Sequence, residues 1–302
     1  MREIIKQDVL DIEVLINKVF HTLTIIHVER LGGLTNHSYK VTLSNKKSYV
    51  VRLPGEGTSE LINRHDEKVS TELACLLGID AKLVYFDENG TKISEFIEDA
   101  VTLNAEMLRE DKTVIKVAKI FSTLHNSNVD TKVPFEVFDM AKSYEDIINK
   151  YHVSMYDDYN EIKNKVMSIK QFVDKDGDVK KVPCHNDSLC ENWVYSGERL
   201  YLIDWEYAGM NDGMWDLADI SIEADYSDEQ DDLLLKSYYN RDASSHEKNR
   251  FIANKLYLDY LWTLWGKTRV PYDGDEMEEY ALNRYLRLKE NIKKFEEGLS
   301  DL

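Results

Sequence analysis

Oxygen-bearing side chains are concentrated in residues 184–207, whose sequence is CHNDSLCENWVYSGERLYLIDWEY. Asp187, Asn192, Asp204 and Glu206 supply three carboxylates and one amide within this stretch. Such oxygen ligands suit Mg²⁺, which binds one or two protein groups and completes its shell with water and phosphate oxygens. A further carboxylate beside such a complex supplies the base that phosphoryl transfer to an alcohol requires.

The elements around this stretch predict how Asn192 and Asp204 come together. Residues 193–195 and 200–203 are aromatic or branched enough to form strands, and residues 196–199 between them have the composition of a turn. In a hairpin of this kind the chain leaves at Asn192 and returns at Asp204, so both side chains lie at its open end. The sequence therefore predicts a metal site at that end.

Asp187 precedes this hairpin on a turn, so it lies near the predicted site without necessarily binding the metal. Taken alone, each of Asp187, Asn192 and Asp204 is equally well explained as a loop cap or a strand end, where such residues are common. The three together, at this spacing, favour the phosphoryl-transfer interpretation.

Composition limits the class of protein. At 302 residues the chain is long enough to bury a sizeable core, in one large domain or two small ones. Its net charge of −18 argues against a nucleic-acid partner and is compatible with a cationic substrate. No apolar run reaches the roughly 20 residues of a membrane span, and the N-terminus lacks a signal-peptide core, so we expect no membrane insertion. The sequence leaves the oligomeric state open.

The three cysteines predict a reducing, cytoplasmic location. Cys75, Cys184 and Cys190 are too few and too irregularly spaced for a disulfide framework. A zinc site that combines Cys184 and Cys190 with His185 is rejected, because the spacing fits no common zinc pattern and no fourth ligand is evident.

The first third of the chain is predicted to be mostly strands. Three short runs with turns between them indicate an antiparallel meander, and a second hairpin turns at Glu88-Asn89-Gly90. Between them the spacing of leucine, isoleucine and valine predicts a helix. The predicted strands are 24–31, 37–43, 48–53, 81–87 and 91–97, and the predicted helix is 60–79.

After about residue 99 helical patterns dominate, and the hairpin of residues 193–203 interrupts them. The predicted helices are 104–127, 141–151, 156–173, 228–240, 246–268 and 275–298, with a capping box at Ser244 to Glu247. The fold class is therefore α+β in two lobes, an antiparallel β-rich nucleotide-binding lobe over 1–98 and a mainly helical catalytic and substrate lobe over 99–302.

The turn between the first two strands has features of a phosphate-binding loop. It reads LGGLTN, and its two glycines allow backbone N–H groups to approach phosphate oxygens, although an ordinary hairpin turn explains it as well. Arg52 lies in the middle of a strand among apolar residues, where a buried cation needs an anionic partner. We expect Glu67, or failing that Glu72, to hold Arg52 against the nucleotide phosphates, unless Arg52 lies on a solvent-facing edge.

These motifs resemble the choline/ethanolamine kinase family, whose kinase-like fold is shared with aminoglycoside phosphotransferases. The resemblance extends over nearly the whole chain, and within the family the bacterial choline kinases of the phosphocholine pathway look most similar. Its most specific part is the His-x-Asp-x4-Asn spacing of residues 185–192 followed by Ile-Asp-Trp-Glu-Tyr at 203–207. The other matching segments are GGLTN, Arg52, INRHDE, LGIDAKLVYF, LIDWEYAGMNDGMWDLA and LWTLW.

The resemblance implies ATP and Mg²⁺ as cofactors, with Asp187 as the catalytic base and Asn192 and Asp204 as the metal ligands. Arg52 would stand where the kinase fold usually has a lysine. The residues assigned to the nucleotide are Gly32, Gly33, Thr35, Asn36, Arg52, Glu67, Glu95 and Ile97. Trp205 departs from the phenylalanine usual in eukaryotic members, and Glu206 either holds a second metal ion through water or orients the loop.

The acceptor side is predicted from the aromatic residues. Trp262 and Trp265 are three residues apart on a predicted helix and so share a face. A trimethylammonium group has no hydrogen to donate, so ring faces and a carboxylate hold it. The resemblance implies that Trp262, Trp265 and Tyr280 line the choline pocket with Glu223, and Tyr207 and Tyr226 are assigned to the same site. The alternative is that these rings simply fill the core of the helical lobe.

The sequence thus favours a choline kinase that converts choline to phosphocholine with ATP. Ethanolamine, thiamine and aminoglycoside kinases on the same scaffold are the alternative enzymes. A pseudokinase that binds nucleotide without transfer is the alternative outside enzymes, although such proteins usually lose the base or a metal ligand, and Asp187, Asn192 and Asp204 are all present.

Overall fold

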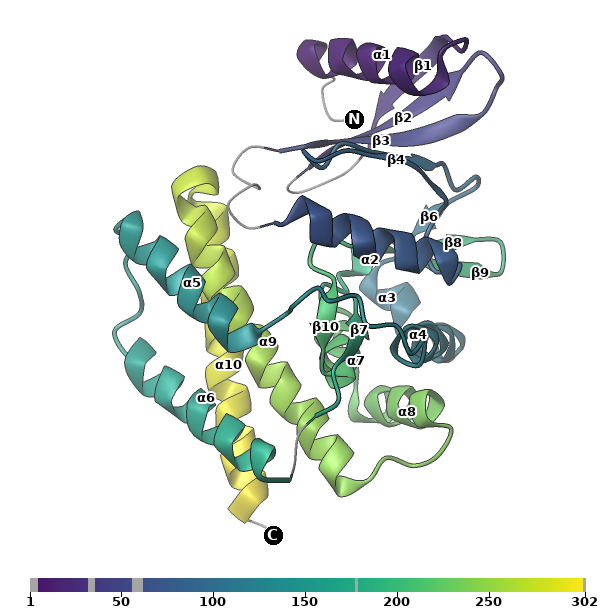
Figure 1. The fold of residues 1–302 in the computed structure, drawn as a ribbon. Coiled ribbons are helices and arrows are strands. Elements are labelled where there is room, and N and C mark those ends of the chain that lie inside the picture. The colour runs from purple at the N-terminus through teal and green to yellow at the C-terminus, as the bar shows by residue number, and fades with distance from the viewer. Residues whose placement is uncertain (1–4, 32–35, 56–61, 177–178, 301–302) are drawn as a thin grey trace. The chain divides into compact units, whose positions relative to one another are not determined.

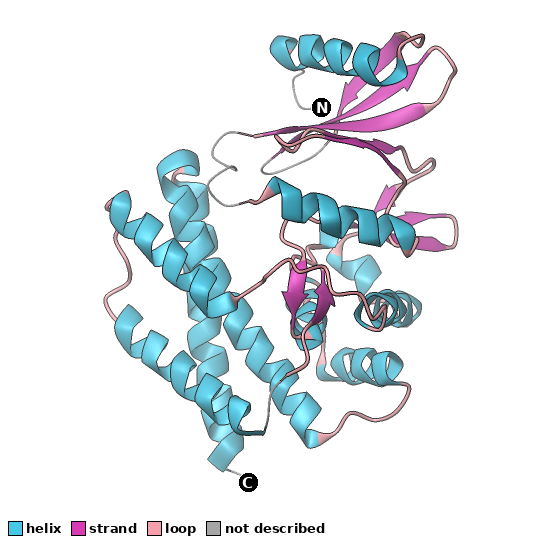
Figure 2. Cartoon of the chain, viewed as in Figure 1, coloured by secondary structure: helices cyan, strands magenta, loops and turns pink. Residues whose placement is uncertain are grey.

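The computed structural model describes residues 5–31, 36–55, 62–176 and 179–300. The chain forms two compact units, one of Met1–Leu103 with Glu191–Ala208 and one of Asn104–Cys190 with Gly209–Leu302. Figures 1 and 2 trace their helices and strands. The lobe boundary expected between residues 98 and 99 stays a prediction.

An antiparallel five-stranded sheet forms the first unit's main layer, in the order β1-β2-β3-β5-β4. The strands are β1 (Ile25–Arg30), β2 (Asn36–Leu43), β3 (Ser48–Pro54), β4 (Leu83–Phe86) and β5 (Lys92–Glu95). The predicted meander and second hairpin are therefore confirmed. The turn between β4 and β5 depends on Gly90, whose φ of +90° is a conformation that side chains rarely tolerate.

A helix at the N-terminal end of this unit, α1 (Lys6–Phe20), was not among the predicted elements, so the description of the first segment as mostly strands was incomplete. Ile12, Leu15 and Ile16 on its buried face pack with Tyr39 and Val41 of β2 in one apolar cluster. The helix therefore covers one face of the sheet (Figure 1).

Helix α2 (Arg64–Leu76) follows β3 and is shorter than the predicted 60–79. The side chain of Asn63 caps its N-terminus by accepting from the backbone of His65 and Asp66. Its buried face contains Glu67 as well as apolar residues, so this helix brings a charged group into the interior of the unit.

The predicted 193–203 hairpin is confirmed as β8 (Trp193–Ser196) and β9 (Arg199–Leu202), with Trp193 opposite Leu202. The two-residue strand β6 (Val101–Thr102) pairs with β8 and completes a small sheet. This sheet also belongs to the first unit, because residues 191–208 return to it.

Helices make up most of the second unit. They are α3 (Ala105–Leu108), α4 (Asp111–His125), α5 (Val137–Lys150), α6 (Tyr159–Val173), α7 (Gly213–Glu223), α8 (Asp228–Tyr239), α9 (Ser245–Asp273) and α10 (Asp275–Ser300), with 3-10 turns at Asp174–Asp176 and Cys190–Asn192. The segment predicted as one helix over 104–127 is thus interrupted after Leu108. The predicted capping box from Ser244 to Glu247 is present.

The longest pair, α9 and α10, packs side by side (Figure 1). In α9 every residue from Leu256 to Leu264 is buried, which explains why this helix carries almost no amphipathic pattern. None of the helices in the described parts of the chain is both long and apolar enough to span a bilayer.

Two short strands, β7 (Val182–Cys184) and β10 (Gly209–Asn211), pair antiparallel in the second unit. The loop that begins at His185 therefore leaves from a fixed strand end. Helix α7 follows β10 directly, after the side chain of Asp212 caps its N-terminus.

Candidate active site

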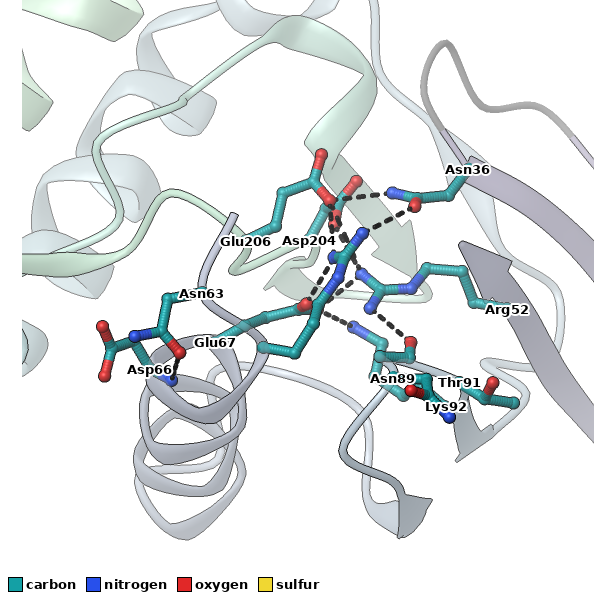
Figure 3. A network of polar contacts seen from close by, with 12 residues as sticks. Asn36, Arg52, Asn63, Asp66, Glu67, Asn89, Thr91, Lys92, Asp204 and Glu206 are labelled. Atoms are coloured by element: carbon teal, nitrogen blue, oxygen red, sulfur yellow. Dashed lines mark hydrogen bonds and ion pairs between the residues drawn. The ribbon is translucent and has the colours of Figure 1, made fainter. Parts of the chain in front are cut away.

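Arg52 on β3 is buried and held by carboxylates of the first unit (Figure 3). Its Nη1 lies 2.5 Å from Oε1 of Glu67, and its Nη2 donates to the carbonyl of Gly90 at 2.8 Å. Glu67, and not Glu72, is therefore its partner. Burial alone would lower the pKa of Arg52, but the charge and hydrogen bond of Glu67 together with the charges of Asp204 and Glu206 raise it, so the guanidinium stays charged.

Glu67 is the centre of this network. Besides Arg52, it accepts from Nη1 of Arg64 at 2.7 Å and lies 3.7 Å from Nζ of Lys92. Burial would raise the pKa of Glu67, but Arg52, Lys92 and Arg64 together lower it to about 2. Arg64 was not among the predicted site residues, although its position one turn before Glu67 on α2 was a signal that could have identified it.

Glu206 belongs to the same network, and its partners are buried. Its Oε2 accepts from Nδ2 of Asn36 at 2.8 Å (Figure 3). The same oxygen accepts from Nη1 of Arg64 at 3.2 Å. Burial and the neighbouring charge of Asp204 raise the pKa of Glu206. Because Asn36 and Arg64 already engage this carboxylate, the arrangement favours the loop-orienting role of Glu206 over the second-metal role.

Asn192 and Asp204 flank the open end of the hairpin, as predicted. The N–H of Ile203 donates to the carbonyl of Asn192 at 2.9 Å, so the backbone of the two strand ends is joined. The side chain of Asp204 is 37% exposed, whereas that of Glu206 is 4% exposed. Asp204 also has a φ of +67°, a conformation uncommon outside glycine that occurs often at functional sites. One accessible carboxylate beside one amide is a donor set that fits Mg²⁺.

In the second unit, Asp187 lies on a loop whose backbone N–H groups are bound by side chains of helix α7. Asp216 on this helix accepts from the N–H of His185 at 2.8 Å and from the N–H of Asn186 at 2.7 Å. Asn186 has a φ of +67°, which turns the chain sharply just before Asp187. The buried carboxylate of Asp216 therefore fixes the backbone just before Asp187.

Asp219, one turn further along α7, holds the other side of the same loop. Its carboxylate accepts a hydrogen bond from the N–H of Ser188 and is 1% exposed. Burial raises the pKa of Asp219 well above its ordinary value, and the charges of Glu223 and Asp187 raise it further. The loop is thus fixed on both sides of Asp187.

A buried histidine supports Asp216 from behind. Nε2 of His125 lies 3.0 Å from Oδ2 of Asp216, and Nδ1 lies 2.9 Å from the hydroxyl of Tyr238. The backbone of Gly213 runs directly beside this ring. His125, Cys184 and Asp216 bring possible metal-ligand atoms within 4.8 Å of one another, but Asp216 and Tyr238 already engage both ring nitrogens. His125, Asp216 and Tyr238 therefore form a hydrogen-bond network that stabilises the loop.

The aromatic residues expected at the acceptor site contact one another edge to face. The ring centroids of Trp262 and Trp265 are 6.0 Å apart, and those of Trp265 and Tyr280 are 5.7 Å apart. Trp262 is 4% exposed, while Trp265 and Tyr280 are half-buried. The three rings therefore form one group, of which Trp262 is the part embedded in the core.

Glu223 at the end of α7 has a partner that the sequence did not indicate. Arg284 on α10 is buried and donates Nη2 to Oε1 of Glu223. The guanidinium carbon of Arg284 also lies over the ring of Tyr280, 5.1 Å from its centroid. The carboxylate and the aromatic group are therefore joined through an arginine.

The remaining predicted site residues are distributed over both units. Tyr226 is buried, and its hydroxyl donates to the carbonyl of Leu108 at 3.0 Å, while Tyr207 is buried in the first unit. Glu95 is exposed and lies 3.6 Å from Lys82, and Ile97 is half-buried after β5. Gly32, Gly33 and Thr35 lie outside the described residues.

Comparison with known proteins identifies the family. The sequence model of the family described as choline/ethanolamine kinase matches residues 28–294. The chain belongs to this family. It is 31% identical over 277 residues to the protein LicA of Haemophilus influenzae, a match that covers 88% of this chain and 80% of that protein.

Solved structures of LicA are similar to this member of the choline/ethanolamine kinase family. The choline kinase LicA of Streptococcus pneumoniae is 34% identical, with a TM-score of 0.82 and coverage of 94% of this chain and 99% of that one. A LicA complex with AMP is 33% identical, with a TM-score of 0.80 and coverage of 95% and 98%. Aminoglycoside phosphotransferases at 15% and 18% identity share the fold alone. The predicted bilobal, protein-kinase-like fold is thereby confirmed.

Proposed function

We propose that this member of the choline/ethanolamine kinase family is a choline kinase, which transfers the terminal phosphoryl group of ATP to the hydroxyl of choline. The observation that carries the proposal is the single group formed by Trp262, Trp265 and Tyr280 in the helical unit that also contains Asp187. Relatives named as choline kinases support the same acceptor.

The nucleotide side of the proposal rests on the first unit. Arg52 is fixed by Glu67 in a buried ion pair, so the position of its guanidinium is set before a nucleotide binds. Asn192 and Asp204 would hold Mg²⁺, which when bound neutralises the charge of the phosphates. Glu206 would keep Asn36 and Arg64 in place around that site.

Asp187 is the proposed catalytic base. A carboxylate accepts the proton of the acceptor hydroxyl and aligns its oxygen for in-line attack on phosphorus. Asp216 and Asp219 hold the backbone before and after this residue, which supports a role that depends on exact placement of one side chain.

Choline is favoured over the other acceptors for chemical reasons. Edge-to-face rings offer surfaces to a methylated cation, and such contacts contribute about 0.5–2 kcal/mol each when water is excluded. An aminoglycoside would need a wide cleft lined by carboxylates, and ethanolamine would need more hydrogen-bond acceptors. Ethanolamine remains the second candidate, because family members at lower identity carry that name. A cytoplasmic location is part of the proposal and rests on three cysteines that are too few and too irregularly spaced for a disulfide framework.

A substrate panel tests the proposal. The purified chain would be assayed with ATP and Mg²⁺ by coupled detection of ADP, with choline, ethanolamine, thiamine and kanamycin as acceptors. We expect the highest kcat/KM with choline and no turnover by the Asp187→Asn variant. A higher kcat/KM with another acceptor would reassign the substrate, and absence of turnover with every acceptor would favour the pseudokinase.

A further inference from the structure

The carboxylate expected to attract the acceptor's ammonium group already has a cation of the chain beside it. Arg284 donates from Nη2 to Oε1 of Glu223, and their side chains are only 7% and 15% exposed. Little water reaches this pair, so the two charges cancel locally instead of being screened by solvent. Glu223 therefore presents much less negative potential to a ligand than a free carboxylate would.

Arg284 is fixed from two further directions. Its guanidinium lies over the ring of Tyr280, and its Nη1 is 3.6 Å from Oδ1 of Asp259, a fully buried residue of α9. Burial would lower the pKa of Arg284, but Tyr280, Glu223 and Asp259 together raise it well above its ordinary value. The positive charge is thus a permanent part of this region.

Ethanolamine and choline should bind differently beside a carboxylate whose charge is neutralised. The primary ammonium of ethanolamine is strongly hydrated, and loss of that hydration is offset only if a carboxylate with unmatched charge accepts its N–H groups. The trimethylammonium of choline has no N–H to satisfy and is held by ring faces such as those of Trp265 and Tyr280. A region that offers rings and a matched carboxylate therefore favours the methylated cation.

We propose that Arg284 is a specificity-determining residue, which disfavours ethanolamine by neutralising Glu223 and so directs the kinase to choline. This inference rests on the proposed function and specifies how its two leading acceptors are distinguished. It assigns discrimination to a residue 61 positions away from Glu223 in the sequence.

The test is the ratio of kcat/KM for choline to kcat/KM for ethanolamine in the intact chain. In Arg284→Met the charge of Glu223 is unmatched, and we expect the ratio to fall about tenfold or more, the size of one charge-assisted hydrogen bond. Most of the change should be a lower KM for ethanolamine, while the KM for choline changes a few-fold. Arg284→Lys keeps the charge and should keep the ratio.

The neighbouring Arg287 provides a matched control. It also binds Asp259, through Nε at 2.9 Å and 3.0 Å, but has no described contact with Glu223. Arg287→Met should leave the ratio unchanged. Because Arg287 continues to satisfy Asp259 in Arg284→Met, that variant should fold. If it does not, Arg284→Gln retains a donor for Glu223 without the charge and should show the same fall.

A double variant separates this mechanism from a general loosening of the region. In Arg284→Met/Glu223→Gln the released carboxylate is absent, so the ratio should return toward the wild-type value. An unchanged ratio in both neutral Arg284 variants, with choline turnover intact, would overturn the inference alone, as would an ethanolamine gain that survives Glu223→Gln. Wild-type protein that does not phosphorylate choline would overturn the proposed function first.

Discussion

The charged residues of the first unit and those around the aromatic rings of the second follow different designs. In the first unit three cations face three carboxylates: Arg52, Arg64 and Lys92 against Glu67, Asp204 and Glu206. In the second, the ion pair of Arg284 and Glu223 lies beside the rings, and Arg284 is also close to Asp259. The difference matches the charges of the two proposed ligands. A metal–phosphate complex is bound by fixed charges, whereas a methylated cation is bound by ring faces.

Asp187→Asn should have the largest effect, because it removes the proposed catalytic base from the second unit and leaves the charged network of the first unit untouched. We expect kcat to fall about a thousandfold, within the range typical of a lost general base. Nucleotide affinity, measured by calorimetry, should change little. The exposed Asp157, in the same unit, supplies the control Asp157→Asn. Near-normal turnover in Asp187→Asn would remove this residue from the catalytic role.

Glu67→Gln tests whether the first unit's charges act as one network. Loss of one carboxylate leaves buried cations partly unmatched, and we expect a loss of about 3 kcal/mol in the free energy of unfolding. Glu72→Gln, on the exposed face of the same helix, should cost almost nothing. Urea denaturation at pH 7 measures both. Equal stability of the two variants would show that the network contributes nothing to folding.

The pH dependence of the same pair sharpens this result. The pKa of Glu67 is lowered from 4.5 to about 2 in the folded chain. A lowered pKa means that the stabilisation is complete above the unfolded value and is lost as the pH falls through the folded value. The stability difference between wild type and Glu67→Gln should therefore shrink as the pH falls from about 4.5 toward 2. A difference that is constant over this window would contradict the assignment.

Asp204→Ala should weaken Mg²⁺-dependent nucleotide binding by about tenfold to a hundredfold, and Asn192→Ala should do so more mildly because an amide is a weaker ligand. The measurement is the KM for ATP over a titration of Mg²⁺. The KM for choline should stay constant, which distinguishes the two regions. If excess Mg²⁺ rescues neither variant and nucleotide affinity is unchanged in both, the hairpin end does not hold the metal.

Trp265→Ala should have the smallest effect. In contrast to the Asp204 and Asn192 variants, it should change the KM for choline. Each lost ring contact costs about 0.5–2 kcal/mol, so the KM for choline should rise from a few-fold to about thirtyfold while that for ATP is unchanged. Trp265→Phe should lose less, because a ring face remains. Trp262→Ala should also lower the melting temperature, since Trp262 is buried. A lower melting temperature without a change in the KM for choline would assign both tryptophans to the core.

Much of this arrangement could be predicted from local sequence. The hairpin placed Asn192 and Asp204 at one end because strand pairing fixes which residues meet. The pairing of Arg52 with Glu67 followed from the cost of a buried, unmatched charge. In both cases the physical rule concerns only a few residues, so it can be applied to a single sequence.

Other elements were missed for identifiable reasons. Helix α1 carries buried residues at helical spacing, Ile12, Leu15 and Ile16, so the sequence does contain the apolar periodicity that predicts this helix. Helix α7 is buried continuously from Gly213 to Ser221, so its polar residues, such as Asp216 and Asp219, do not mark a solvent-exposed face. Strands β7 and β10 have three residues each, too few for any alternation to be visible.

The arginine partners could not have been predicted, because their roles depend on tertiary contacts. Arg284 lies on a helix whose surface contains other arginines and lysines, and only the packing of α10 shows that it meets Glu223. The same holds for Asp219, whose bond to the N–H of Ser188 joins residues 31 positions apart.

Gly213 has a consequence for how natural and engineered variants of this chain should be interpreted. A β-carbon at this position would come within 2.8 Å of Nδ1 of His125, so any other residue must displace that ring. Displacement would reach the loop of Asp187 through the carboxylate of Asp216. In a saturation screen scored by activity, substitutions of Gly213 would therefore group with those of reactive residues, although glycine contributes no reactive atom. A functional map of this enzyme drawn from such data would therefore include residues that do not react, among them those whose contacts hold the loop of Asp187 in place.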